Sequence, residues 1–148
     1  MLRVIVEKGQ RIVSIIQRIL GAYSVAIAAV VGVLFFLTPV YDDGSTGYPT
    51  WVVVNWFMAP AVLIALAASF SWKLGLNRDG TGDADLRRSI EVNTLFYSAL
   101  ILALWYLSNW FGDMVGREVP LLWSFIDPLY VAVTGACGVR LWRSAGSG

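Results

Sequence analysis

Apolar residues fall into four long segments that polar connections separate. The segments cover residues 19–40, 51–72, 92–112 and 120–139. Each is about 20 residues long, which is the length that an α-helix needs to cross a hydrocarbon core of about 30 Å. The pattern therefore predicts an all-α integral membrane protein built as a bundle of four transmembrane helices. We expect residues 19–143 to form this bundle and residues 144–148 to be a flexible tail.

The first 18 residues show a different, amphipathic pattern. Their polar side chains recur at spacings of three and four residues, as on one face of a helix. These polar residues are Arg3, Glu7, Gln10, Arg11, Ser14, Gln17 and Arg18. We therefore predict an amphipathic helix over residues 1–18. It either lies in the membrane interface with its cations toward lipid headgroups, or extends the first transmembrane helix into the cytoplasm.

The basic residues indicate how the segments are oriented. Of the 11 Lys and Arg residues, ten lie before the first segment, between the second and third, or after the fourth. Only Arg117 lies in a connection on the opposite side. Because cytoplasmic loops carry an excess of Lys and Arg, this distribution predicts that both termini are cytoplasmic. The location that we expect is the inner membrane of a bacterium.

The amino-acid composition argues against several classes of function. The chain is 57% hydrophobic and has a mean hydropathy of +0.67, which suits a membrane protein. It has no histidine and one cysteine, Cys137, so the usual haem and zinc ligands and any internal disulfide are missing from the sequence. No catalytic pair and no basic patch with interleaved aromatics is visible. We expect no catalysis by the chain alone, no nucleic-acid partner and no cofactor of its own; lipid or quinone is the ligand class that such a bundle accommodates.

Small residues recur every four positions in the first two segments. They are Ser24, Ala28 and Gly32 in the first segment, and Ala61, Ala65 and Ser69 in the second. Apolar surface gives little net attraction between helices in lipid, so close backbone approach at small residues becomes a main source of packing. These residues are predicted to lie at helix–helix contacts.

The third segment has large side chains where the others have small ones. Trp105, Tyr106 and Trp110 lie in its second half. Large amphipathic rings anchor membrane proteins to lipid interfaces and to protein partners. We therefore expect these three aromatics to face lipid or a partner subunit.

Asp127 is the only Asp, Glu, Lys or Arg residue inside an apolar segment, and it allows two interpretations. An intramembrane carboxylate is costly and is by default a functional candidate. Its candidate partners in the sequence are Tyr106, Asn109, Asn55 and Arg117. Alternatively, Asp127 is the N-cap of a helix with Pro128 at its first position, and residues 120–126 form a separate interfacial segment. The second interpretation is the one that we favour from the sequence.

These patterns predict a function by exclusion. With no redox ligands and no catalytic set, the chain is expected to be a non-catalytic accessory subunit of a larger membrane complex, such as an oxidoreductase or a transport assembly. Its partners would be membrane lipids and larger membrane subunits. The alternative is a small transporter subunit, or a homo-oligomeric transporter or channel, that uses Asp127.

Overall fold

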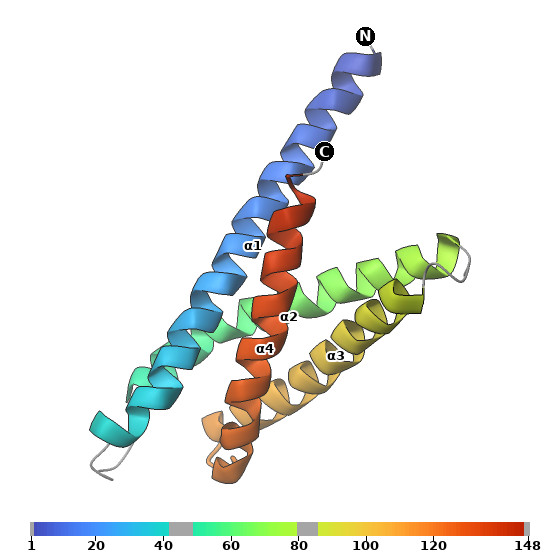
Figure 1. The fold of residues 1–148 in the computed structure, drawn as a ribbon. Coiled ribbons are helices and arrows are strands. Elements are labelled where there is room, and N and C mark those ends of the chain that lie inside the picture. Colours follow the sequence, from blue (N-terminus) through green and yellow to red (C-terminus); the bar gives the residue numbers. More distant parts are fainter. Residues whose placement is uncertain (1, 42–48, 80–85, 147–148) are drawn as a thin grey trace.

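The computed structural model describes residues 2–41, 49–79 and 86–146, and these residues form four helices. The helices are α1 (Leu2–Tyr41), α2 (Pro49–Asp79), α3 (Leu86–Met114) and α4 (Pro120–Ser144) (Figure 1). Each is long and apolar enough to cross a membrane. The prediction of an all-helical chain with four helices of membrane-spanning length is thus confirmed. Of the predicted tail, Ser144 ends α4, Ala145 and Gly146 follow it, and residues 147 and 148 lie outside the described residues.

The four helices are arranged as two pairs. α1 and α4 lie side by side and share the most extensive contact, and α2 and α3 form the second pair (Figure 1). The pairs diverge toward the ends that carry the chain termini and the α2–α3 connection. α3 contacts α2 and α4 but, over the described residues, not α1. It therefore lies at the edge of the bundle.

α1 is one continuous helix of 40 residues, about 60 Å long at 1.5 Å per residue. The predicted amphipathic helix is therefore an extension of the first apolar segment and not a separate element. No strong helix breaker lies between them, and Gly9 alone costs a helix only about 1 kcal/mol. The extension is held at its base, where Ser14 Oγ and Arg18 Nη2 donate to the carbonyl of Ala145 at distances of 2.7 and 3.3 Å.

The course of α4 corrects the favoured interpretation of Asp127. α4 runs without a break from Pro120 to Ser144, with Val119 as its N-cap residue and Pro128 inside it. Asp127 is therefore not an N-cap, and residues 120–126 are not a separate segment. Pro120 already provides the restricted φ angle that favours a helix start. A proline further along removes one N–H donor and crowds the carbonyl four residues earlier, which a packed helix in a membrane protein can tolerate.

Small residues allow the backbones of α1 and α4 to approach closely. A Cβ atom added at Gly138 would lie 2.9 Å from the carbonyl oxygen of Gly21, and one added at Gly21 would lie 2.8 Å from the carbonyl oxygen of Gly138. Further along, Gly32 adjoins the side chain of Val131. Five of the six predicted packing residues are buried, and Gly32 is half-buried; the five are Ser24, Ala28, Ala61, Ala65 and Ser69.

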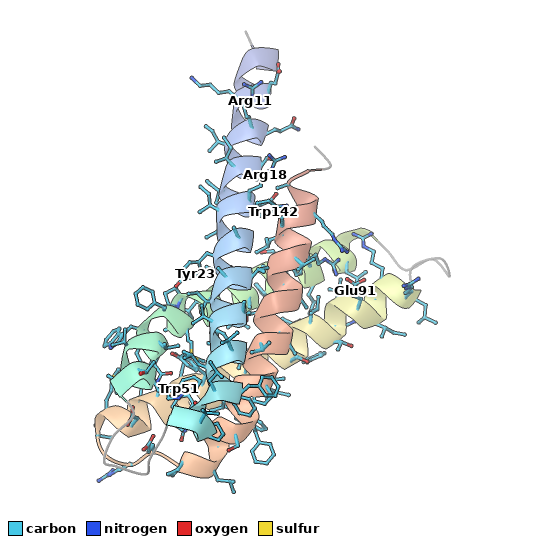
Figure 2. The ribbon with its side chains drawn as sticks, turned by 60° about the vertical axis from the view of Figure 1, so that its left-hand side comes forward. Arg11, Arg18, Tyr23, Trp51, Glu91 and Trp142 are labelled. Atoms are coloured by element: carbon cyan, nitrogen blue, oxygen red, sulfur yellow. The ribbon has the colours of Figure 1, made fainter. Side chains whose placement is uncertain are left out.

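Polar contacts join the helices near both ends of the bundle. At the end that carries the termini, Arg140 of α4 pairs with Glu91 of α3 and its guanidinium lies over the ring of Trp72 in α2. Figure 2 shows Arg11, Arg18 and Trp142 on this side and Trp51 at the opposite end. Trp51 donates from Nε1 to Thr38 of α1 at 3.2 Å, which ties α1 to α2 there.

Candidate functional site

Asp127 lies inside the bundle. Its residue is 6% exposed, and the described part of the chain offers its Oδ1 atom no hydrogen-bond partner. No salt bridge joins it to a described Lys or Arg. A buried carboxylate without a cation is unfavourable in an apolar interior, so the groups that surround Asp127 decide what it can do.

Tyr106 of α3 is the central residue of this region. It is fully buried, and its hydroxyl donates to the backbone carbonyl of Asn55 in α2 at 2.5 Å. Its hydroxyl lies close enough to Asp127 for the two groups to interact electrostatically. Its ring packs against Tyr130 of α4, with 6.5 Å between the ring centroids. Tyr106 therefore adjoins polar groups from both α2 and α4.

Two of these neighbours also carry polar atoms without a partner. Asn55 is 5% exposed and Tyr130 is fully buried, and neither Asn55 Oδ1 nor the Tyr130 hydroxyl has a hydrogen-bond partner among the described residues. We refer to Asn55, Tyr106, Asp127 and Tyr130 as the buried polar cluster. Three helices contribute to it, so the tertiary fold creates it.

The predicted partners of Asp127 are only partly brought together. Tyr106 and Asn55 lie in the cluster, whereas Asn109 has another role. Asn109 Oδ1 accepts from the backbone N–H of Val119 at 2.8 Å, and its Nδ2 donates to the carbonyl of Val119 at 3.3 Å. Arg117 is exposed in the α3–α4 connection and forms no salt bridge with Asp127.

The structure also corrects the expectation that all three aromatics of the third segment face outward. Tyr106 is fully buried and Trp110 is only 7% exposed, because their face of α3 packs on α2 and α4. Trp110 contacts Trp56 of α2 edge to face, with 5.0 Å between the ring centroids. Trp105 is 43% exposed and remains a candidate for contact with a partner. One residue along a helix turns the side chain by about 100°, which separates Trp105 from Tyr106.

The opposite face of α3 is exposed along its whole length. Seven exposed residues follow one another at alternating steps of four and three residues, and we call them the α3 outer seam. They are Ile90, Thr94, Tyr97, Ile101, Leu104, Ser108 and Phe111. The hydroxyl of Tyr97 accepts from Lys73 Nζ at 2.8 Å, which leaves its own proton to donate. A seam with this spacing has the geometry of a helix–helix contact.

An apolar groove lies between α1, α2 and α4 on the outside of the bundle. It has a volume of about 380 Å³. Its walls include Leu20, Leu63, Ile64, Ala67, Ser71 and Leu141. The groove offers apolar surface and little polar surface, so its chemistry suits a lipid or isoprenoid chain.

The sequence analysis did not identify two tyrosine residues that lie near the buried polar cluster. Tyr130 lies three residues after Asp127 on the same face of α4, so helical spacing could have identified it. Tyr23 of α1 donates from its hydroxyl to the carbonyl of Phe57 at 2.7 Å, and it lies near Tyr106 and Tyr130. No local signal pairs Tyr23 with α2, because the crossing of the two helices is a property of the fold.

Comparison with known protein families, curated proteins and solved structures finds no match for this chain.

Proposed function

We propose that the chain is a non-catalytic subunit of a larger integral-membrane complex, such as an oxidoreductase or a transport assembly, and that it docks on a transmembrane helix of another subunit through the α3 outer seam. The observation that carries the proposal is the position of hydroxyl groups on an exposed helix face. Thr94, Tyr97 and Ser108 all lie in the seam. In lipid, polar side chains at helix surfaces gain by hydrogen bonding to a neighbouring helix.

The rest of the fold supports the choice of α3. α1 and α4 use their small residues on each other, and α2 uses its small residues on the interior. α3 lies at the edge of the bundle and contacts only α2 and α4 among the described helices. Trp105 lies beside the seam and is 43% exposed, so it can act as a rigid anchor at such an interface.

The proposal is tested by removing the seam hydroxyls while keeping the side-chain volume close to the original. The variant carries Thr94→Val, Tyr97→Phe and Ser108→Ala. In a mild detergent extract, the wild-type chain should migrate as part of a complex on a native gel, and the variant should migrate alone. A matched control carries Ser71→Ala and Ser124→Ala, which remove exposed hydroxyls from α2 and α4. Equal migration of wild type and seam variant would contradict the proposal.

The same proposal places the protein in a bacterial inner membrane with both termini in the cytoplasm. The asymmetry of basic residues supports this orientation. Arg11 and Arg18 of α1 lie toward the end that carries the termini (Figure 2), and Arg140 and Arg143 lie in the last two turns of α4. The apolar groove between α1, α2 and α4 is the place where a bound lipid or quinone would lie.

A second candidate function is transport through an oligomer of the chain, with Asp127 as the coupling acid. The buried polar cluster favours this candidate, since an unpaired intramembrane acid often marks an ion or proton path. Its test is solute or proton flux in liposomes that contain the purified chain alone. Flux that Asp127→Asn abolishes would establish transport, and absence of flux would reject it.

A further inference from the structure

The face of α1 that points away from the bundle carries a second exposed seam. Its residues follow one another at alternating steps of three and four, and each of them is exposed. Among the described helices, α1 contacts α4 and α2, and these contacts leave the seam uncovered. A repeat of seven residues that continues over about four heptads is typical of a helix that pairs with another helix. We call these residues the α1 outer seam, and they are Ile12, Ile15, Ile19, Ala22, Ala26, Ala29, Val33, Phe36 and Val40.

In a membrane, lipid chains can cover only part of this seam. Arg18 donates to a carbonyl at the end of α4, and Thr38 accepts from a tryptophan near the opposite end of the bundle. The distance between them along α1 is about 30 Å, which is the thickness of a hydrocarbon core. Ile12 and Ile15 precede Arg18, where α1 reaches and then passes the end of α4 (Figure 1). A lone chain would expose both side chains to headgroups and water, so we expect another protein helix to cover them.

The side chains of the seam suit the medium at each level. The part at and before the edge of the hydrocarbon carries isoleucine, and covering it with a helix removes apolar area from water. Within the hydrocarbon this driving force is lost. The next three seam residues are Ala22, Ala26 and Ala29, which allow two helix backbones to approach closely. A single partner helix that continues from water into the hydrocarbon would therefore fit both parts.

The length of α1 and the positions of its charges favour a second copy of α1 as this partner. The partner must pass the hydrocarbon at the same end, as α1 itself does with its 40 residues. Arg11 and Arg18 lie on one edge of the seam, and Ile16 and Tyr23 lie on the other edge. In a parallel pair of identical helices, opposite edges face each other, so the arginines meet Ile16 and Tyr23 of the second copy. An antiparallel pair would instead bring the arginine edges together.

We propose that two copies of the chain form a parallel dimer through the α1 outer seam, with the twofold axis along the membrane normal. This inference rests on the proposed membrane location. Four of the five alternate seam positions carry a β-branched residue, which favours two strands: Ile12, Ile19, Val33 and Val40. A strict repeat of seven residues gives a left-handed crossing of about 20°. The same face serves both copies, so α3 remains available for another subunit.

The first test measures the mass of the purified full-length chain in detergent by sedimentation equilibrium. The wild type should have the mass of two copies. Ala26→Leu should weaken dimerisation by about tenfold or more, because the added side chains overpack the closest part of the seam in both copies. Ala132→Leu is the matched control, because Ala132 is an exposed alanine on α4 outside the seam. It should dimerise as the wild type does.

The second test uses disulfide cross-linking in native membranes, in the Cys137→Ala background. In a parallel dimer, each seam residue faces its own counterpart across the axis. Ile15→Cys should therefore give a covalent dimer when a mild oxidant is added. Val13→Cys is the control, because Val13 is equally exposed but lies about 200° around the helix from Ile15. It should stay monomeric under the same conditions.

Three outcomes would overturn the proposal: a wild type that is monomeric at every protein-to-detergent ratio, an unchanged dimer affinity in Ala26→Leu, or equal cross-linking of Ile15→Cys and Val13→Cys. If Ala26→Leu does not fold, the cross-linking result decides alone. Neither test involves another subunit, so a dimer that persists when the α3 docking test fails would reject only the docking. Recovery of the chain in the membrane fraction tests the membrane location separately.

Discussion

At the scale of single residues, the bundle depends on contacts that tolerate no added atom. Gly21 and Gly138 each occupy a position where a Cβ atom would lie within 3 Å of the other's carbonyl oxygen. Backbone atoms cannot move aside as a flexible side chain can, so α1 and α4 would have to separate. The glycine residues at this crossing are therefore required by packing and not by backbone conformation.

Gly138→Ala is expected to destabilise the protein. The added Cβ would lie 2.9 Å from the carbonyl oxygen of Gly21 and 3.0 Å from Cβ of Ser24, and overpacking of this kind costs about 1–3 kcal/mol. Gly135→Ala is the control on the same helix, because its Cβ would meet only Cβ of Ala28 at 3.9 Å. Thermal unfolding in detergent should show a lower Tm for the first variant and an equal or higher Tm for the second. Equal losses of Tm would contradict the close crossing.

A second residue-scale prediction concerns Asn109, whose side chain binds both backbone polar groups of Val119. Asn109→Ala removes two hydrogen bonds at the start of α4, and each contributes about 0.5–1.5 kcal/mol. We expect a lower Tm and faster proteolysis at the α3–α4 connection. Ser108→Ala, at the neighbouring exposed position, should leave both measurements unchanged for the isolated chain. A wild-type proteolysis rate in Asn109→Ala would show that the connection is held by other contacts.

At the scale of elements, each helix buries one face in the interior, and these buried faces pack through side chains of different size. α1 and α4 approach through small residues, whereas α3 presents the large rings of Tyr106 and Trp110 to the interior. α2 contacts both α3 and α4. Trp56 of α2 contacts Trp110 of α3, and the carbonyl oxygen of Ala65 lies 4.0 Å from Sγ of Cys137 in α4. The two-pair arrangement follows from these unequal faces.

Because one face of α2 is buried, replacing two alanine residues that lie two positions apart should change Tm by very different amounts. Ala65 is fully buried and Ala67 is exposed beside the apolar groove. Ala65→Leu should cost about 1–3 kcal/mol, because the interior has no room for three more carbon atoms. Ala67→Leu should leave Tm close to that of the wild type. Tm should be lower for Ala65→Leu than for Ala67→Leu. The opposite order would show that the face of α2 with Ala65 is not the buried one.

At the scale of the whole molecule, the four helices and the placement of the basic residues predict how the chain sits in a membrane. If all four helices cross the membrane, their even number puts both termini on one side, and the excess of Lys and Arg there predicts that this side is cytoplasmic. Reversal would place ten of the 11 basic residues on the outside.

Cysteine labelling in intact cells tests this orientation. The background variant is Cys137→Ala, since Cys137 is the chain's one cysteine. In that background, a cysteine at Val115, which is 69% exposed in the α3–α4 connection, should react with a membrane-impermeant maleimide. A cysteine at Ser147 should react only after the cells are permeabilised. Labelling of position 147 in intact cells would show the opposite orientation.

Several properties of this protein follow from the sequence by itself. The length and hydropathy of the four segments predict four long apolar helices, because these are local properties of each segment. The four-residue spacing of small residues also predicts which faces of α1 and α2 are buried, since helical periodicity places such residues on one side. The sequence left open whether residues 1–18 lie in the membrane interface or extend the first segment, and the structure shows the extension, with α1 continuous from Leu2.

The sequence named Asn55 and Tyr106 among four candidate partners of Asp127, and the fold selected these two and excluded Asn109 and Arg117. The sequence could not say whether Asp127 begins a helix or lies inside one, because the Asp-Pro pair is compatible with both. The continuous course of α4 resolved the choice by placing its start at Pro120. Tyr130 lies one turn after Asp127 on α4, so helical spacing alone relates the two residues. The contacts of Tyr106 with Asn55 and Tyr130, and the inward orientation of Trp110, depend on how α2, α3 and α4 cross. Helix crossing is set by the packing of all the side chains together, so no local pattern contains it.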